Sequence, residues 1–243
     1  MTTPDPGSDG PASDVVLLAH GSPDPRHARD VSSLVCRVAA AAPHLAVRAA
    51  YLDHHPPSVA EVGARLAEVG DADGRGPVAL VPVLLTRAFH VRVDVPAAAQ
   101  VLAEASGREI LTTDALGPDV LLARALEELL RQRSECQVVV YLAGSSRRDA
   151  VDELVERLRA DLIPERRYAF ATLDDHLPLT TALRQLDVRA GVVGVSAMIA
   201  EGVLRDRMMR RCAERGIPFA AGVLADTDSL TRLLLDRVDA ARS

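Results

Sequence analysis

Three side chains that can bind a metal ion or move a proton follow apolar runs of the sequence. His20 ends the run VVLLAH, Asp53 ends AVRAAYLD, and His90 follows VALVPVLLTRAF. Neutral imidazole binds first-row divalent metals and can accept a proton, and a neighbouring carboxylate can orient the ring or take up a proton. These residue types therefore suit metal or acid–base chemistry, provided that the fold brings them together.

Short apolar runs alternate with longer amphipathic stretches in the first half of the chain. Four runs predict strands, at 14–20, 46–53, 78–85 and 109–116. Helical spacing of Ala, Val and Leu predicts helices over 27–42, 58–69, 94–105 and 118–132. Such alternation predicts a parallel sheet with right-handed crossovers, covered on both faces. Ligands of these sheets bind beyond the carboxyl ends of the strands, where His20, Asp53 and His90 fall.

The second half of the chain repeats the pattern of the first. QVVVYLAGSS at 137–146 matches DVVLLAHGS, AFATLDDH at 169–176 matches RAAYLDHH, and two later segments, 191–207 and 220–238, match the rest. We therefore expect an α/β protein with two similar doubly wound parallel-sheet lobes, each of four strands, related by an internal pseudo-repeat. The predicted division is a disordered tail over 1–13, an N-terminal lobe with the active site over 14–132, and a degenerate C-terminal lobe over 137–241.

Composition excludes several classes of function. The 243 residues include 28 basic and 34 acidic ones, a net charge of −6, with no Trp, three Tyr and three Phe. A nucleic-acid binder is therefore disfavoured, because basic surface and aromatic stacking platforms are both scarce. Three widely spaced cysteines favour reduced thiols over a disulfide framework. No signal peptide or membrane-spanning run is present, so we expect a cytoplasmic protein without a membrane partner.

Two motifs resemble those of a known family. LLAHGSPDPR at 17–26 and VPVLLTRAFHVRVDVP at 81–96 resemble the sirohydrochlorin chelatases, class II chelatases of the CbiX and SirB type. The resemblance covers nearly the whole chain past residue 13. It implies a lyase that inserts Fe²⁺ or Co²⁺ into a tetrapyrrole without a nucleotide. It also implies that His20 and His90 bind the metal and act in catalysis, with Asp53 where the family usually has Glu.

Metal insertion explains why such residues are needed. The metal must be partly dehydrated while the pyrrole N–H groups of the macrocycle lose two protons in the same cavity. Two histidines and a carboxylate, open on one side, hold the metal loosely enough to release it. In the second half Ala143 replaces His20 and Leu204 replaces His90, while a carboxylate remains at 174–175 beside a histidine. Only one active cleft is therefore expected.

The implied substrate, sirohydrochlorin, has eight carboxylates, so the cleft should present cations. Arg26 and Arg92 are the candidates for pairing with these carboxylates, whereas Arg87 is not favoured. Ser22 and the backbone amides of Gly21 and Ser22 could hold another acidic group. We expect a monomer with an internal pseudo-dimer.

Several alternatives stay open. Fe²⁺ insertion towards sirohaem is favoured, with Co²⁺ insertion towards cobalamin, or a non-catalytic metal or tetrapyrrole carrier, as alternatives. AHG is similar to the RHG of histidine phosphatases but lacks the arginine, and LDHHPP is similar to DHH phosphoesterases but lacks a preceding D-x-D. Asp53 could instead hold a turn.

The remaining histidines are ranked by their surroundings in the sequence. We expect His27 and His44 to be solvated helix residues, and His176 to be a relic of the repeat or a surface residue. His54 and His55 form either a metal entry site or a polar loop.

Overall fold

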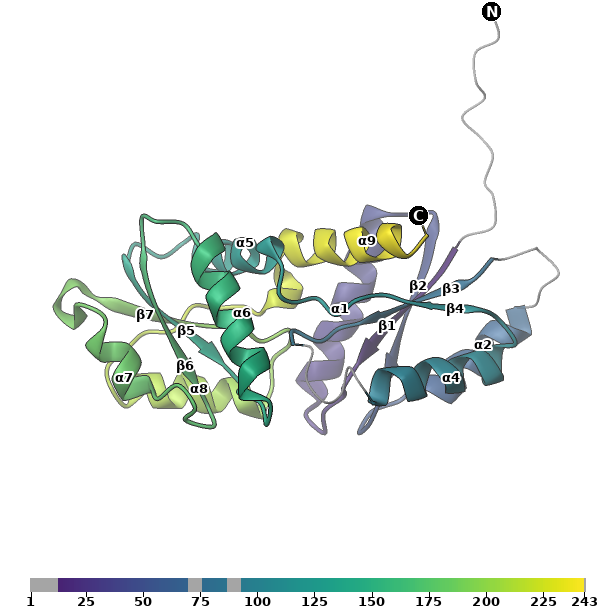
Figure 1. Cartoon of the computed structure of the whole chain (residues 1–243), viewed down its shortest axis with the longest axis horizontal. Helices are drawn as coiled ribbons and strands as arrows, with labels where there is room; N and C mark the ends of the chain where they lie inside the picture. The colour runs from purple at the N-terminus through teal and green to yellow at the C-terminus, as the bar shows by residue number, and fades with distance from the viewer. Residues whose placement is uncertain (1–12, 70–75, 87–92, 243) are drawn as a thin grey trace, which may run out of the picture.

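The computed structural model describes residues 13–69, 76–86 and 93–242 (Figure 1). The predicted tail therefore lies outside the described residues, except Ser13, which already begins the first strand. The predicted site residues His90 and Arg92 also lie outside them, as does Arg87. In the described part of the chain no helix is both long and apolar enough to cross a membrane.

The first sheet is parallel and has the strand order β2-β1-β3-β4. Its strands are β1 (Ser13–Ala19), β2 (Leu45–Tyr51), β3 (Val78–Pro82) and β4 (Ile110–Thr112). The helices of this half are α1 (Pro25–Ala41), α2 (Val59–Val69), α4 (Asp94–Ser106) and α5 (Val120–Leu129). The predicted alternation is confirmed, although β3 ends three residues early, at a proline whose nitrogen cannot donate to the ladder.

The second sheet is also parallel and has the order β6-β5-β7. Its strands are β5 (Gln137–Leu142), β6 (Arg167–Thr172) and β7 (Val192–Ser196). The helices are α6 (Arg148–Asp161), α7 (Leu179–Arg184), α8 (Val203–Ala213) and α9 (Asp228–Arg242), with short 3₁₀ turns η2 (Val188–Ala190) and η3 (Leu224–Asp226).

The expected fourth strand of the second lobe is reduced to a single bridge. Phe219 pairs with Gly194, whose N–H donates to the Pro218 carbonyl at 2.8 Å. The ladder does not extend on either side, because Pro218 has no N–H and Gly222 takes a φ of 83° as the chain turns into η3. The prediction of four strands in this half is therefore wrong.

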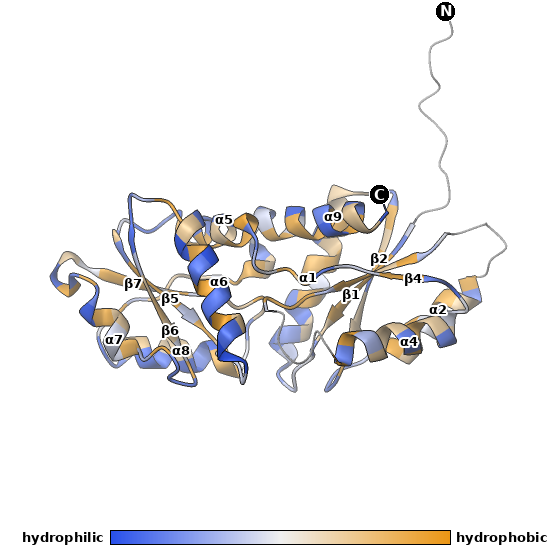
Figure 2. Cartoon of the chain, viewed as in Figure 1, coloured by the Kyte–Doolittle hydropathy of each residue, from blue (hydrophilic) through white to orange (hydrophobic). Residues whose placement is uncertain are grey.

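Alternation along the central strands gives each sheet two apolar faces. Val15 and Leu17 of β1 join one buried cluster, whereas Val16 and Leu18 point into another with α2 and α4. The central strand of the second sheet divides its residues in the same way. The matched division confirms the pseudo-repeat. Apolar and hydrophilic residues share the same helices, as the mixed colours of α4 and α6 show (Figure 2).

The two halves exchange their last helices. Although α9 ends the second half, it packs on α1 and on strands β3 and β4 of the first half. Conversely, α5 contacts α6 and β7 of the second half (Figure 1). A contiguous division near 132–137 therefore separates the strands of the two sheets but not the helices that cover them.

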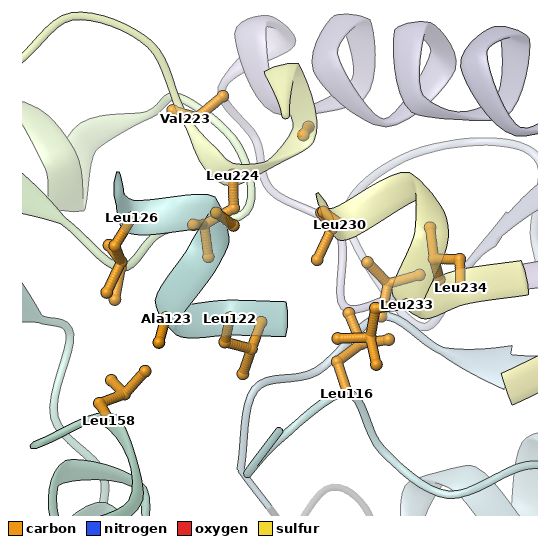
Figure 3. Packing of buried hydrophobic residues seen from close by; sticks show 14 of the residues in the cluster. Leu116, Leu122, Ala123, Leu126, Leu158, Val223, Leu224, Leu230, Leu233 and Leu234 are labelled. Atoms are coloured by element: carbon orange, nitrogen blue, oxygen red, sulfur yellow. The ribbon is translucent and has the colours of Figure 1, made fainter. Parts of the chain in front are cut away.

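One apolar cluster joins the halves where α5 and α9 meet (Figure 3). It contains inward-facing residues of both sheets together with Leu122, Leu126, Leu230 and Leu233. Polar contacts fix the crossing as well. Arg237 of α9 donates to the carbonyls of Ala115 and Leu116 and to the Asp119 carboxylate. Glu128 of α5 accepts the N–H groups of Asp228 and Ser229 at the start of α9.

Because the central cluster is shared, truncation within it should destabilise the whole chain. Leu233→Ala is expected to lower the free energy of unfolding by about 2–5 kcal/mol, and both halves should unfold in one transition. Urea unfolding followed by circular dichroism measures both quantities. Val188→Ala is the control, since Val188 is 57% exposed and should change stability by less than about 0.5 kcal/mol. Two separate transitions would contradict a shared core.

Candidate functional site

The loop after β1 presents His20 against the end of β2. The Asp53 N–H donates to the His20 carbonyl at 2.9 Å, and the Leu52 N–H donates to the Ala19 carbonyl at 3.0 Å. Gly21 has a φ of 93°, and a Cβ there would lie 1.8 Å from the Asp53 carbonyl oxygen. Only glycine fits this close approach. The predicted substrate-binding residue Gly21 thus has a structural task in holding the two loops together.

The second lobe builds the same loop without the histidine. Gly144 has a φ of 91°, and a Cβ there would lie 2.3 Å from Cγ of Asp174. Among the described residues the non-glycine positions with positive φ are His54 and Asp175, which follow Asp53 and Asp174 in the repeat. The repeat therefore preserves the backbone of the site down to its left-handed residues.

His20 lies between two cavities. One, of about 450 Å³, lies between the lobes and is lined by the loops that follow β1, β3, β5 and β7. The other, of about 540 Å³, lies within the first lobe, against α2 and α4, and is lined by Asp53 and Asp94. Both volumes lie within the range of small-molecule sites. Among the predicted site residues that the structure describes, His20 is the one that lines both.

Asp53 faces the first-lobe cavity, and its carboxylate is 67% exposed. One oxygen accepts the His54 N–H at 2.7 Å, and the other lies 3.4 Å from Nε2 of His54. The His54 ring is centred 6.4 Å from the His20 ring. The structure thus brings His20, Asp53 and His54 to one edge of the sheet. His55 instead packs against Tyr51, with ring centroids 4.9 Å apart.

His27 lines the interlobe cavity together with His20. It lies in the first turn of α1, is half-buried, and its Nδ1 is buried without a hydrogen-bond partner. Burial lowers the pKa of His27, and the charges of His20 and His55 lower it further, against the carboxylates of Asp30 and Asp24. The prediction of a solvated helix residue is therefore wrong for His27. His44 is exposed, beyond the end of α1.

The predicted substrate-binding side chains of the motif make contacts within the protein. The Ser22 hydroxyl accepts the Asp24 N–H at 3.1 Å. The Arg26 guanidinium lies between Asp24 of its own helix and Asp206 of α8, at 2.6 Å from an oxygen of each. Hydrogen bonds from Arg26 hold the pKa of Asp24 at about 2 and lower the pKa of Asp206.

The walls of the interlobe cavity differ in polarity. The first lobe contributes four polar side chains to its lining, His20, Ser22, His27 and Thr86, beside the apolar Ala19, Val31, Val83, Leu84 and Leu85. The second lobe contributes mainly apolar side chains: Leu142, Ala143, Val151, Leu154, Ala197, Met198, Ile199, Ala200, Val203 and Leu204. Histidines aside, Glu201 is the charged residue among the described lining; Arg26 is not part of that lining, and Arg92 lies outside the described residues.

The described residues contain no group of three or more His, Cys, Asp or Glu that could hold a metal ion. The predicted ligand pair of His20 and His90 lies partly outside the described residues, so the pair stays a prediction. Sequence reasoning ranked His27 too low, because its first-turn position gave no sign that it faces a cavity formed with the second lobe.

Comparison with known proteins shows which family and which solved structures this chain is similar to. The CbiX family model matches residues 14–133, which include the strand-end loops of His20 and Asp53. The chain belongs to the CbiX family. No curated protein matches it by sequence.

Solved structures extend the likeness to the second lobe. SirB from Bacillus subtilis with Fe³⁺ is 16% identical, with a TM-score of 0.77, covering 94% of this chain and 95% of that one. SirB from Bacillus subtilis subspecies spizizenii, in complex with cobalt, is 16% identical with a TM-score of 0.73, covering 94% of each chain. CbiX, described as the terminal enzyme of sirohaem biosynthesis in denitrifying bacteria, is 18% identical with a TM-score of 0.66, covering 95% and 100%. At these identities the likeness shows a shared two-lobed fold.

In this CbiX-family chain the second-lobe carboxylates are occupied by structural contacts. Asp174 accepts the N–H groups of Ser145 and His176 at 3.2 Å each, and Asp175 pairs with Arg211 at 2.8 Å. Nε2 of His176 lies 2.8 Å from Asp152 of α6. These contacts close the second-lobe loops on themselves.

The close approach at Gly21 gives a stability prediction. Gly21→Ala should destabilise the fold by clearly more than Gly107→Ala, which adds a Cβ at a φ of 68° in open space and costs about 1–2 kcal/mol. The difference reflects the clash with the rigid Asp53 carbonyl. Urea unfolding of both variants tests this, and equal costs would contradict the close approach.

The buried face of His27 gives a pH prediction. Below the ordinary histidine pKa of about 6.5, the unfolded chain binds a proton at His27 that the folded chain binds only at lower pH. Acidification through this window therefore destabilises the folded state. His27→Gln should lose less stability than the wild type between about pH 7 and pH 5, as measured by urea unfolding. His44→Gln is the exposed control, and equal pH slopes for His27→Gln and the wild type would contradict the expectation.

Proposed function

We propose that the chain is a chelatase that inserts a divalent metal ion into sirohydrochlorin, with Fe²⁺ as the favoured metal and no nucleotide. The observation that carries this proposal is the place of His20. It lies beyond a strand end, in a CbiX-family loop, and reaches both an interlobe cavity and the Asp53 carboxylate's cavity. The metal is a substrate of this reaction.

The site residues divide the work of insertion. His20, with His90, binds the incoming metal ion through neutral imidazole. Asp53 is exposed and close to a strand-end histidine, so it can accept a proton released by the pyrrole nitrogens. Each proton that leaves a pyrrole N–H leaves an electron pair on nitrogen, and that pair binds the metal. His27 is held neutral by burial in the same cavity, so no cation from His27 repels the metal near neutral pH.

The interlobe cavity suits a flat macrocycle with an acidic periphery. The apolar second-lobe wall can pack against the ring, while Gly21 and Ser22 of the lining and the neighbouring Arg26 would hold carboxylates. Arg92, which lies outside the described residues, is a further candidate for this role. The two lobes of one chain form this cavity, and we propose that the protein acts as a monomer.

Two alternatives to iron insertion follow from the same site. The usual divalent order favours Co²⁺ slightly over Fe²⁺ at imidazole and carboxylate, so Co²⁺ insertion is the second candidate reaction. A carrier that holds metal or tetrapyrrole without turnover is the non-enzymatic candidate. Absorbance of sirohydrochlorin during single and multiple turnovers with each metal separates these cases, since a carrier yields at most one equivalent of metallated product.

The proposal predicts that His20→Ala abolishes metal insertion while the fold is kept, because His20 lies on a loop outside the buried clusters. We expect the rate to fall by at least about a hundredfold, the range seen for loss of one essential group. Absorbance change on metallation measures the rate, and circular dichroism reports the fold. His44→Ala, at an exposed histidine, should leave the rate unchanged. A near wild-type rate for His20→Ala would refute the assignment.

A further inference from the structure

Arg26 joins the two walls of the interlobe cavity at its rim. Its Nη1 and Nη2 donate to the two carboxylate oxygens of Asp206 at 3.1 and 2.6 Å, a bidentate pair between α1 and α8. Its Nε and Nη2 donate to Asp24 at 3.1 and 2.6 Å. Planar guanidinium makes such paired contacts well, and a single guanidinium here serves two carboxylates.

A second contact fixes the same loop of the second lobe. The Glu201 N–H donates to the buried carboxylate of Asp30 at 2.7 Å, and the Glu201 side chain lies 4.0 Å from Arg26. Gly202 follows Glu201, and a Cβ added to Gly202 would lie 3.9 Å from Cβ and Oδ2 of Asp24. The segment from Ala200 to Asp206 is thus clamped onto the start of α1, and it lines the cavity from Ala200 to Leu204.

The carboxylates around Arg26 differ in their distance from it and in their exposure. Asp24 and Asp206 pair with Arg26 at 2.6 Å each, whereas Glu201 lies 4.0 Å from Arg26 and closer to Arg29 and Arg205, at 3.5 and 3.7 Å. The Asp206 side chain is 40% exposed, whereas that of Asp24 is 11% exposed. An entering carboxylate can therefore reach the Asp206 side of Arg26 more readily than the Asp24 side. Because the Arg26–Asp206 pair is partly exposed, breaking it costs little free energy, and a ligand carboxylate can take its place.

We propose that Arg26 is an exchangeable positioning residue: a carboxylate of the entering ligand replaces Asp206 on its guanidinium and loosens the 200–206 segment from α1, while the contact between the Glu201 N–H and Asp30 remains. The inference rests on the proposed function for the identity of the ligand, a polycarboxylate macrocycle. Asp206 then acts as an internal competitor for the ligand carboxylate, and Asp24 keeps the guanidinium in place throughout.

The test compares two variants that break the same pair from opposite sides. Asp206→Asn leaves Arg26 without its competitor, so uroporphyrin, a porphyrin with eight carboxylates, should bind about fivefold more tightly. Arg26→Gln removes the cation, so uroporphyrin should bind about fivefold more weakly. Porphyrin fluorescence without metal gives the affinities. Asp228→Asn is the matched control, because it breaks the Arg37–Asp228 pair, also at 2.6 Å, which lies away from the cavity lining.

Amide hydrogen exchange of the 200–206 segment supplies a readout independent of activity. Both Asp206→Asn and Arg26→Gln should speed this exchange in the absence of ligand, and uroporphyrin should speed it in the wild type. Asp206→Glu should restore wild-type protection, because it restores the charge. Thermal unfolding of all variants checks that the fold is kept.

The outcomes separate this inference from the proposed function. Equal changes in uroporphyrin affinity for Asp206→Asn and Arg26→Gln would overturn the exchange and indicate a purely structural pair. Unchanged hydrogen exchange in both variants would overturn the clamp, even if sirohydrochlorin is metallated normally. Faster exchange and opposite affinities, in a protein that inserts no metal, would support the inference and refute the proposed function.

Discussion

The packing of α5 and α9 into one apolar cluster fixes how the two sheets face each other, and the site depends on it. Residues of both central strands, β1 and β5, point into this cluster, so the two strand-end loops at 20–22 and 143–145 open into the same space. Shared burial of this kind is non-directional and strong. The polar contacts of Arg237 and Glu128 add direction, because they fix where one helix ends and the other begins.

Much of this architecture could be predicted from sequence. Apolar runs gave the strands, and the repeat of Gly21 and Gly144 after each first strand gave the pairing of the lobes. The helix exchange could not be predicted, because α5 and α9 have the same apolar spacing whichever sheet they cover. The repeat match predicted a fourth strand in the second lobe, and it took no account of Pro218, which has no N–H to donate to a ladder. Tertiary context decides both features.

The candidate site, like the fold, could be predicted from sequence only in part. The place of His20 and Asp53 at strand ends follows from topology, which sequence patterns report well. The surroundings of Arg26 and His27 do not follow from sequence patterns. For example, Asp206, which pairs with Arg26, lies 180 residues away along the chain. The predictions of a substrate-binding Arg26 and a solvated His27 both left out the second lobe, which supplies Asp206 and the far wall of the cavity. Long-range pairs of this kind leave no local signal in a single sequence.

The exchange of terminal helices also has a consequence for synthesis of the chain. The strands of the first sheet leave the ribosome long before residues 228–242, so the face of β3 and β4 that α9 contacts is uncovered during that interval. Until α9 is synthesised, part of an apolar face of the first lobe stays uncovered. Any fragment that stops between the lobes leaves this face open.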